Sequence, residues 1–528
     1  MVKTGKKGGN RKMKRSLLRL LPLMAAVTLA TSCSKDDDNN APEKKQNASP
    51  QEKNIIYNPD GTVTIPYSIK YSTGKSLDKK MTYSDDGMTS KYEPTEDDEI
   101  IVSGEGVSGT LTLQYELSDF GGKVPVFKGN LTATSEDAAD NLMRNRTSLT
   151  YEYGTAIEEP ASSNKSLQDL MESCNHLYTA TGKYSDESIT LTDQNTYLAI
   201  SMSPCCKHDI TINDNDFTVE DGRIWIAVPG GKPVKSTGLG TELDKAAKDV
   251  VPGTIHTVAR QYFTVSSDKK VYFSKGNLQY NPAAGQWRFA EHQYDCCVTG
   301  AGITATKDEY DITAWYNTVT KYNGWIDLFG WGMWLEAKGN DPLRIATNGE
   351  YYSTITSSSN DYQSLPDNPV IGSEWTTLTA GQPQSNQEWD YLLAHLKDVN
   401  GFGGGHIITE EGLTINGMIL LPDDWSLPNG IKFNSCKQNA VDFTANEYTV
   451  KQWEKMEANG AVFMPAAGMA VLGKVNLEEF NNKCRYWTST DALYDDCNAY
   501  IISARKKFFY QDNVDRSYGL SVRLVRPL

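Results

Sequence analysis

Cys33 is the residue whose surroundings most clearly predict a chemical modification. It follows the small and apolar residues 29–32, a pattern typical of the site that lipoprotein signal peptidase cleaves. A basic stretch, residues 3–15, and an apolar stretch, residues 17–30, precede it, and the apolar stretch is too short to span a bilayer. Each buried lipid methylene contributes about 0.8 kcal/mol to membrane binding. We therefore expect residues 1–32 to be removed and acyl chains on Cys33 to anchor the protein to a membrane.

Directly after Cys33 the chain is acidic and then strongly polar. Asp36, Asp37 and Asp38 follow within five residues, a pattern that resembles the export signal of surface-displayed Bacteroidetes lipoproteins. A solvated spacer is the alternative. Residues 33–52 contain too few apolar side chains to bury a core, so we interpret them as a disordered tether. The expected location is the outer face of the cell outer membrane.

Catalytic residue types are present but do not form a known motif. None of the six His lies in a His-Glu-x-x-His pattern, and no Ser lies in a Gly-x-Ser-x-Gly pattern. Residues 401–406 are glycine-rich but lack the Lys and Ser or Thr of a phosphate-binding loop. We expect no enzyme activity and no cofactor, and keep an extracellular polysaccharide-processing enzyme or accessory protein as an alternative.

Two short segments contain residue types that bind metals. Cys205, Cys206 and His208 fall within four residues, which is too crowded for the paired spacing of zinc sites, so we expect no zinc there. Asp423 and Asp424 are the best candidates for the oxygen ligands of calcium, although a turn explains them as well.

Net charge and cysteine content narrow the class of partner. Residues 1–32 carry eight Lys or Arg and no acid, so their removal takes the formal net charge from −15 to −23. Nucleic acid is an unsuitable partner for so acidic a chain.

Of the eight cysteines beyond Cys33, three precede residue 262 and five follow it, so either each half keeps a free thiol or one disulfide joins the halves.

Apolar periodicity divides the folded part into two differently built halves. Apolar residues alternate with polar ones over 63–71 and 111–117, which predicts strands with one buried face. Pro66 lacks an N–H and places the first of these at a sheet edge. Further strands are expected at 189–191, 197–202 and 224–228, the last after an Asp221-Gly222 turn. Leu167, Leu170, Met171 and Cys174 predict one helix among them.

The second half mixes helices with strands. Ser385 and Glu388 have the spacing of a capping box, and Trp389, Leu392, Leu393 and Leu396 then recur at helical spacing. Thr449 and Gln452 predict a second box, with Gly460 ending that helix in the left-handed region. Closing strands are expected at 499–502, 508–510 and 521–525.

Two family resemblances agree with this division. Residues 166–171, 189–195, 224–229 and 251–258 resemble fimbrillin-like proteins, which implies β-sandwich modules and, in that family, pilus subunits. A tighter set resembles the FISUMP, or major paralogous, domain of Bacteroidetes surface lipoproteins, which implies an α+β fold of C-type-lectin-like type: residues 271–279, 287–294, 324–332, 417–425, 460–468, 486–490 and 519–525.

We accordingly predict a multidomain chain, N-terminal all-β and then α+β. Its parts are β-sandwich modules at 53–160 and 161–262 and a C-type-lectin-like domain at 263–528. The β modules would act as a stalk, and the last domain would bind a glycan or a host or matrix protein. Assembly with other pilus subunits is the alternative.

The predicted ligand contacts lie in an aromatic stretch of the last domain. Trp325 and Trp331 more often belong to a core, because large aromatics dominate cores. The segment between Trp334 and Trp375 is rich in Ser, Thr, Asn and Tyr, a composition typical of adaptable recognition loops. Its candidate contact residues are Trp334, Tyr351, Tyr352 and Tyr362.

Overall fold

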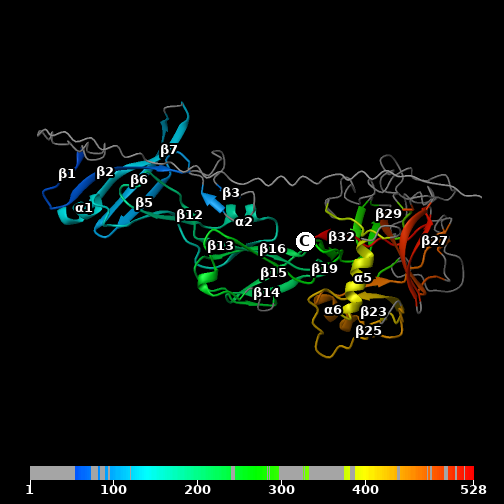
Figure 1. Cartoon of the computed structure of the whole chain (residues 1–528). Helices are drawn as coiled ribbons and strands as arrows, with labels where there is room; N and C mark the ends of the chain where they lie inside the picture. The colour runs from blue at the N-terminus through cyan, green and yellow to red at the C-terminus, as the bar shows by residue number, and fades with distance from the viewer. Residues whose placement is uncertain are drawn as a thin grey trace, which may run out of the picture. The chain divides into compact units, whose positions relative to one another are not determined.

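The structure is a computed structural model of the whole chain (Figure 1). It describes residues 54–72, 81–83, 90–92, 95–118, 121–239, 244–281, 284, 286–296, 325, 327–331, 374–380, 387–436, 440–471, 474–475, 479–492, 498–505, 508–516 and 518–528. The architecture is mostly β, with several sheets and few helices. Within these residues, no helix combines the length and apolar content needed to cross a bilayer.

An eleven-stranded sheet occupies the first part of the chain. Its order is β1-β2-β7-β6-β5-β8-β10-β12-β4-β3, with β11 parallel to β2. The strands are β1 (Ile56–Tyr57), β2 (Val63–Tyr71), β3 (Met81–Tyr83), β4 (Ser90–Tyr92), β5 (Glu99–Gly104), β6 (Val107–Leu117), β7 (Lys123–Ala133), β8 (Leu149–Gly154), β10 (Leu177–Gly182), β11 (Ser188–Ile189) and β12 (Thr192–Asp193).

This sheet folds over its own buried face. Three strands separate β2 from β8 in the order, yet the Tyr67 and Tyr151 hydroxyls are 2.7 Å apart and buried. Neighbouring strands lie about 4.8 Å apart, so a flat sheet could not bring these side chains together. The predicted alternation of β2 is confirmed, since every second residue from Val63 to Tyr71 is buried. Pro66 pairs with Asn130 of β7. On the other side of β2, the described strands β1 and β11 pair with residues 63–64 and 70–71, so β2 is not itself the edge strand, but no described strand pairs with Pro66 on that side.

The sequence pattern missed one helix in this part, α1 (Glu136–Met143). Ser135 caps it by accepting a hydrogen bond from the Ala138 N–H at 3.1 Å, and Ala139 and Leu142 are its buried residues. Ala138 and Met143 also pack against the core, so the four apolar residues recur at helical spacing, and together with the Ser135 cap they were the signal available in the sequence.

Two smaller sheets follow. One has the order β18-β13-β16-β9 and the other β15-β14-β17, and together they enclose an apolar cluster from Leu198 to Val258. Their elements are β9 (Ala161–Ser163), α2 (Leu167–Ser173), β13 (Asn195–Ser201), β14 (His208–Ile212), β15 (Asn215–Val219), β16 (Arg223–Pro229), β17 (Ser236–Thr237), the short 3₁₀ helix η3 (Ala247–Asp249) and β18 (Ile255–Ala259).

Several predicted elements are confirmed here. Helix α2 buries Leu167, Leu170 and Met171, and the turn before β16 has positive φ at Asp221 and Gly222. The strand expected at 189–191 is instead divided between β11 and β12. The strands after residue 160 belong to different sheets. Strand β9 pairs with β16 in a smaller sheet, whereas β10 and β12 belong to the eleven-stranded sheet. The division at residue 160 therefore stays a prediction.

Among the described residues, the last part of the chain combines small sheets with two α-helices. The sheets have the orders β19-β20-β32, β21-β22, β25-β23-β24-β26, β27-β28 and β29-β30-β31. The elements are β19 (Phe263–Thr264), β20 (Lys270–Phe273), β21 (Leu278–Asn281), β22 (Gln286–Phe289), α5 (Glu388–Asp398), β23 (Phe402–Ile408), β24 (Thr414–Leu420), β25 (Glu447–Thr449), α6 (Val450–Ala458), β26 (Val462–Pro465), β27 (Ala470–Val471), β28 (Lys474–Val475), β29 (Lys483–Asp491), β30 (Asn498–Arg505), β31 (Phe508–Asp515) and β32 (Val525–Pro527).

The two helices test the predicted capping boxes. The box of α6 is confirmed, because the Thr449 side chain accepts from the Gln452 N–H while Gln452 bonds back to residue 449; Gly460 follows with φ +87°. The box predicted for α5 is wrong. That helix begins at Glu388 itself, after Gln387, without a side-chain cap. The Glu388 carboxylate instead accepts from the Thr379 N–H at 2.9 Å and pairs with Lys269, and a tertiary partner has thus replaced the local one.

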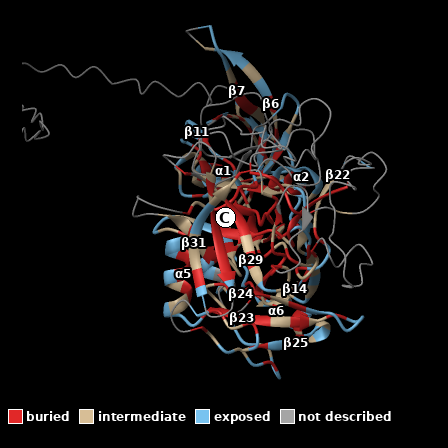
Figure 2. Ribbon diagram, turned by 90° about the vertical axis from the view of Figure 1, so that its right-hand side faces the viewer, coloured by how far each residue is buried: buried red, intermediate tan, exposed pale blue. Residues whose placement is uncertain are grey.

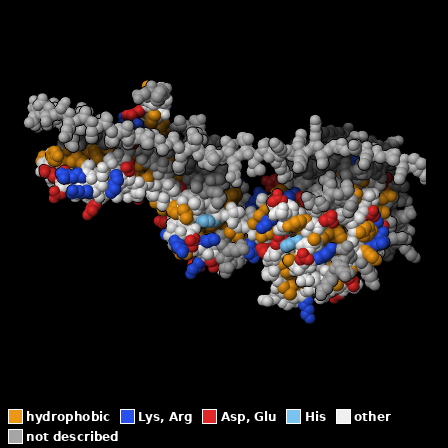
Figure 3. Space-filling view, viewed as in Figure 1, with side chains coloured by type: hydrophobic (Ala, Val, Ile, Leu, Met, Phe, Trp, Pro, Cys, Tyr) orange, Lys and Arg blue, Asp and Glu red, His pale blue; other side chains and the backbone are white. Residues whose placement is uncertain are grey.

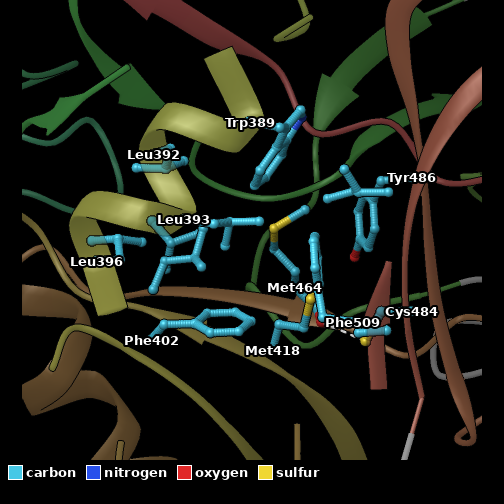
Figure 4. Close-up of a cluster of buried hydrophobic side chains, with 14 of the residues drawn as sticks. Trp389, Leu392, Leu393, Leu396, Phe402, Met418, Met464, Cys484, Tyr486 and Phe509 are labelled. Atoms are coloured by element: carbon cyan, nitrogen blue, oxygen red, sulfur yellow. Dashed lines mark hydrogen bonds between the residues drawn. The ribbon is translucent and has the colours of Figure 1, made fainter. Parts of the chain in front are cut away.

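Helix α5 supplies one wall of the main core of this part. Trp389 and Leu393 project toward Phe402, Met418 and Met464 (Figure 4). Buried residues concentrate on β23, β24 and β29, whereas the outer face of α5 is exposed (Figure 2). Burying one such side chain contributes about 1.5–3 kcal/mol, so this cluster holds the helix to the sheets.

Candidate functional site

The residues predicted to carry lipid and ligand lie outside the described residues. These are Cys33, Trp334, Tyr351, Tyr352 and Tyr362. What the structure does show is where the predicted contact loop begins and ends, and which side chains surround those two points.

Trp331 and Trp375 flank that loop, and both belong to one buried aromatic cluster. The Trp331 Nε1–H donates to the Thr488 carbonyl oxygen at 2.8 Å, and the ring is 2% exposed. Trp375 lies edge-on to Phe289, with ring centroids 4.9 Å apart, and Thr376 bridges to Val525 of β32. The core interpretation of Trp331 is confirmed, and the two described residues that flank the loop belong to the same buried cluster.

A polar face lies beside this cluster on the β21–β22 hairpin. Trp287 and Phe289 of β22 pack against the aromatic cluster. Arg288 lies between them in sequence and therefore on the opposite face of the strand. Its Nε–H donates to Gln279 Oε1 at 2.9 Å, and its guanidinium carbon is 3.8 Å from the centroid of the Trp325 ring.

Trp325 thus differs from Trp331 although both occur in one motif. The Trp325 side chain is half-buried and stacked under a guanidinium rather than enclosed by apolar groups. Burial lowers the pKa of Arg288, and the negative charges of Glu291 and Asp295 act against that shift. Strand alternation through Trp287, Arg288 and Phe289 was the signal in the sequence that could have located this face.

Asp423 and Asp424, the weak calcium candidates, bind protein groups. Asp424 pairs with Arg260 at 2.9 Å and accepts from the Gln261 N–H at 2.9 Å. Asp423 accepts from the Thr264 side chain and lies 3.2 Å from His395 Nε2. These carboxylates bind residues 260–264 and lie beside His395, so their oxygens already have partners.

A buried cluster that sequence reasoning missed joins α2 to the neighbouring strands. Cys174 Sγ lies 3.5 Å from His176 Nε2, and His176 Nδ1 lies 3.1 Å from the Asp193 carboxylate. Tyr197 also donates its hydroxyl proton to Asp193. Asp193 reaches the cluster because β12 pairs with β10 in a register that places it opposite Tyr178. No local sequence motif predicts the pairing of β10 with β12.

The order Cys, His, Asp is that of a nucleophile, a base and an orienting carboxylate. Burial lowers the pKa of His176, but the hydrogen bonds with Asp193 and Cys174 outweigh it and raise the pKa to about 10. The imidazole is therefore protonated at neutral pH, and its Nε2–H donates to the Met171 carbonyl oxygen at 2.6 Å. A protonated imidazole cannot take a proton from Cys174, so the cluster acts as a buried ion pair.

Comparison with known proteins adds little. No protein-family profile and no curated protein sequence matches the chain. A solved structure of a fimbrial protein from Bacteroides ovatus ATCC 8483 shares 11% sequence identity over 82% of this chain and 95% of its own, with a TM-score of 0.18. A TM-score that low supports no conclusion about fold or function. The fimbrillin-like and lectin-like resemblances remain predictions.

Proposed function

We propose that the chain is a lipid-anchored surface protein whose last domain binds a glycan or a protein ligand. Cys33 would supply the anchor, the β sheets of residues 54–261 would act as a stalk, and the binding site would combine the loop between Trp334 and Trp375 with the Arg288–Trp325 face. The lectin-like fold and the outer-membrane location belong to the same proposal.

One observation carries this proposal: Trp331 and Trp375, the described residues that flank the predicted contact loop, belong to a single buried aromatic cluster, which lies beside a half-buried Trp–Arg pair. Long polar segments fixed at both ends on a rigid scaffold are a common way to build a binding site. Tryptophan faces stack on the apolar side of sugar rings, while guanidinium and amide groups bind hydroxyl or carboxylate oxygens.

Surface charge agrees with a compact ligand rather than a polyanion. On the described part of the face in Figure 3, Lys and Arg side chains are interspersed with Asp and Glu. Where charges of both signs alternate in this way, local stacking and hydrogen bonds would contribute more to recognition than a long-range field.

The test is binding of the full-length chain to glycan arrays and to a panel of matrix proteins. We expect at least one ligand class to bind, and Trp325→Ala to weaken it at least about 10-fold, since a stacked aromatic contributes roughly 0.5–1.5 kcal/mol beyond its buried area. Trp425→Ala is the matched control, because Trp425 is also half-buried but packs in a different cluster.

Absence of binding across both panels would overturn the recognition role. Isolation of polymers that contain the chain would favour the pilus-subunit alternative. An unmodified amino terminus in mass spectrometry of the mature protein would remove the anchor from the proposal.

A further inference from the structure

Three potential metal ligands converge where β13 leads into β14. After Ser201 the chain turns through residues 202–207, and His208 begins β14 opposite Val219 of β15. The Met202 N–H donates to the Gly222 carbonyl oxygen at 2.8 Å, which ties the turn to the neighbouring hairpin. The turn is therefore held at both ends by sheet hydrogen bonds.

Within this turn, Cys205, Cys206 and His208 present their side chains to one another. The two sulfur atoms are 3.2 Å apart, and Cys206 Sγ is 3.7 Å from His208 Nε2. All three potential ligand atoms lie within 4.8 Å of one another. Cys205 is 2% and His208 7% exposed, and neither cysteine forms a disulfide.

These distances differ from what the sequence spacing led us to expect. The spacing rule assumes ligand pairs on separate backbone turns. Here Cys206 and His208 are two residues apart in sequence, where the chain leaves the turn and enters β14, and their side chains contact each other. The tight turn at residues 204–206 then brings Cys205 back to the same point. Crowding in the sequence therefore does not prevent convergence in space.

We propose that Cys205, Cys206 and His208 bind one thiophilic cation with a filled d shell, Cu(I) or Zn(II). Binding forms two metal–sulfur bonds and one metal–nitrogen bond, and each thiol that becomes a ligand releases one proton to solvent. Thiolate and imidazole ligands favour these two ions.

The geometry needs only a small adjustment. With metal–sulfur bonds of about 2.3 Å and metal–nitrogen bonds of about 2.0 Å, ligand atoms around one cation lie roughly 3.5–4 Å apart. The 3.7 Å sulfur–nitrogen distance already fits, and the sulfur pair must separate by roughly 0.5 Å. His208 Nε2 lies 2.9 Å from the Ser203 carbonyl oxygen, and coordination through Nε2 replaces that contact.

The charges around the site act in both directions. The Cys205 thiol donates toward the Glu457 backbone carbonyl oxygen at 3.1 Å, and the negative charge of the Glu457 carboxylate acts on Cys205. The charge of the buried Arg523 also acts on Cys205. Among the described residues, Arg523 Nε and Nη1 have no hydrogen-bond partner. Two thiolates with Cu(I) leave one net negative charge, which this guanidinium would offset.

The experiment titrates the reduced full-length chain with Cu(I) and, separately, with Zn(II), each in competition with a chromogenic chelator. We expect one equivalent to bind, and X-ray absorption of the complex to show two sulfur ligands and one nitrogen ligand. Cys206→Ser should weaken binding by more than the roughly 10- to 100-fold that loss of an outer-shell group costs.

Cys174→Ser is the matched control, since Cys174 and His176 repeat the Cys-x-His spacing with a 3.5 Å sulfur–nitrogen contact but without a second thiol. His208→Gln provides a second variant should Cys206→Ser fail to fold, which circular dichroism will show. Binding that survives in a Cys205→Ser/Cys206→Ser chain overturns the site. So does a disulfide between these two residues in the purified chain whose reduction restores no binding.

Discussion

The chain contains two Cys-x-His segments whose surroundings make them chemically different. In the first, His176 is bound on both ring nitrogens, by Asp193 and by the Met171 carbonyl oxygen. In the second, His208 faces the Ser203 carbonyl oxygen and Cys206, with a further thiol beside it, and among the described residues no carboxylate forms a hydrogen bond with it. The first segment is thus part of a buried His–Asp ion pair, and the second is a cluster of two thiols and an imidazole.

The difference comes from strand pairing rather than from the segments themselves. The register of β10 with β12 brings a carboxylate to His176, whereas the turn before β14 brings a second cysteine to His208. Identical spacing therefore says little about chemistry until the non-local partner is known. The variants below separate the two roles, in order of decreasing expected effect.

Asp193→Asn should have the largest effect. It leaves the His176 imidazolium buried without its counter-ion, and breaking a buried pair in this way costs about 3–5 kcal/mol. The loss of unfolding free energy is measured by urea denaturation at pH 7, monitored by tyrosine fluorescence. Glu220→Gln is the control, because the Glu220–Lys207 pair is exposed and should matter little. Equal losses of unfolding free energy in the two variants would mean that the buried pair does not stabilise the fold.

The pH dependence of stability should follow the same pair. The folded-state pKa of His176 is raised from 6.5 to about 10, so its contribution is fully present below pH 6.5 and is lost as pH rises through 10. The integrated change is at most about 5 kcal/mol. His176→Gln should flatten the stability profile between these limits. A histidine proton resonance of residue 176 that titrates near its ordinary pKa would contradict the assignment.

Sequence alone predicted the parts of the fold that depend on neighbours along the chain. The alternation of β2, the capping box of α6 and the turn at Gly222 follow from residues a few positions apart. The false capping box at Glu388 shows the limit, because its carboxylate is taken by Thr379 and Lys269, which are distant in sequence. Tertiary partners override local signals wherever they offer a stronger contact.

The candidate sites divide in the same way. The Arg288 face was within reach of sequence reasoning, because it follows from strand alternation next to a recognised aromatic cluster. The His176–Asp193 pair was not, since two β-strands had to be placed in register first. The Asp424 carboxylate, one of the weak calcium candidates, instead binds Arg260 and the Gln261 N–H.

A smaller loss is expected for Tyr197→Phe. This change removes the hydroxyl that donates to Asp193 but keeps the ring and the ion pair. A hydrogen bond to a charged group contributes about 1.5–3 kcal/mol, less than the loss of the carboxylate itself. Tyr153→Phe removes a comparable phenol–carboxylate bond, to Asp98 at 3.1 Å, in a partly buried place, and should cost less in the same urea experiment. A larger loss of stability for Tyr153→Phe than for Tyr197→Phe would show that Tyr197 stabilises the pair very little.

The smallest effect belongs to Cys206→Ser without added metal. Cys206 is half-buried and has no charged partner among the described contacts, so its replacement should cost less than about 1 kcal/mol. Adding cation should then separate the variants. Wild type at a free cation concentration of 100 times Kd gains about 2.7 kcal/mol, whereas Cys206→Ser gains little and Cys174→Ser keeps the gain. If Cys174→Ser abolished the cation-dependent rise in melting temperature and Cys206→Ser kept it, the cation would bind at the Cys174 segment instead. The reason is that a ligand stabilises only a fold that contains its intact site.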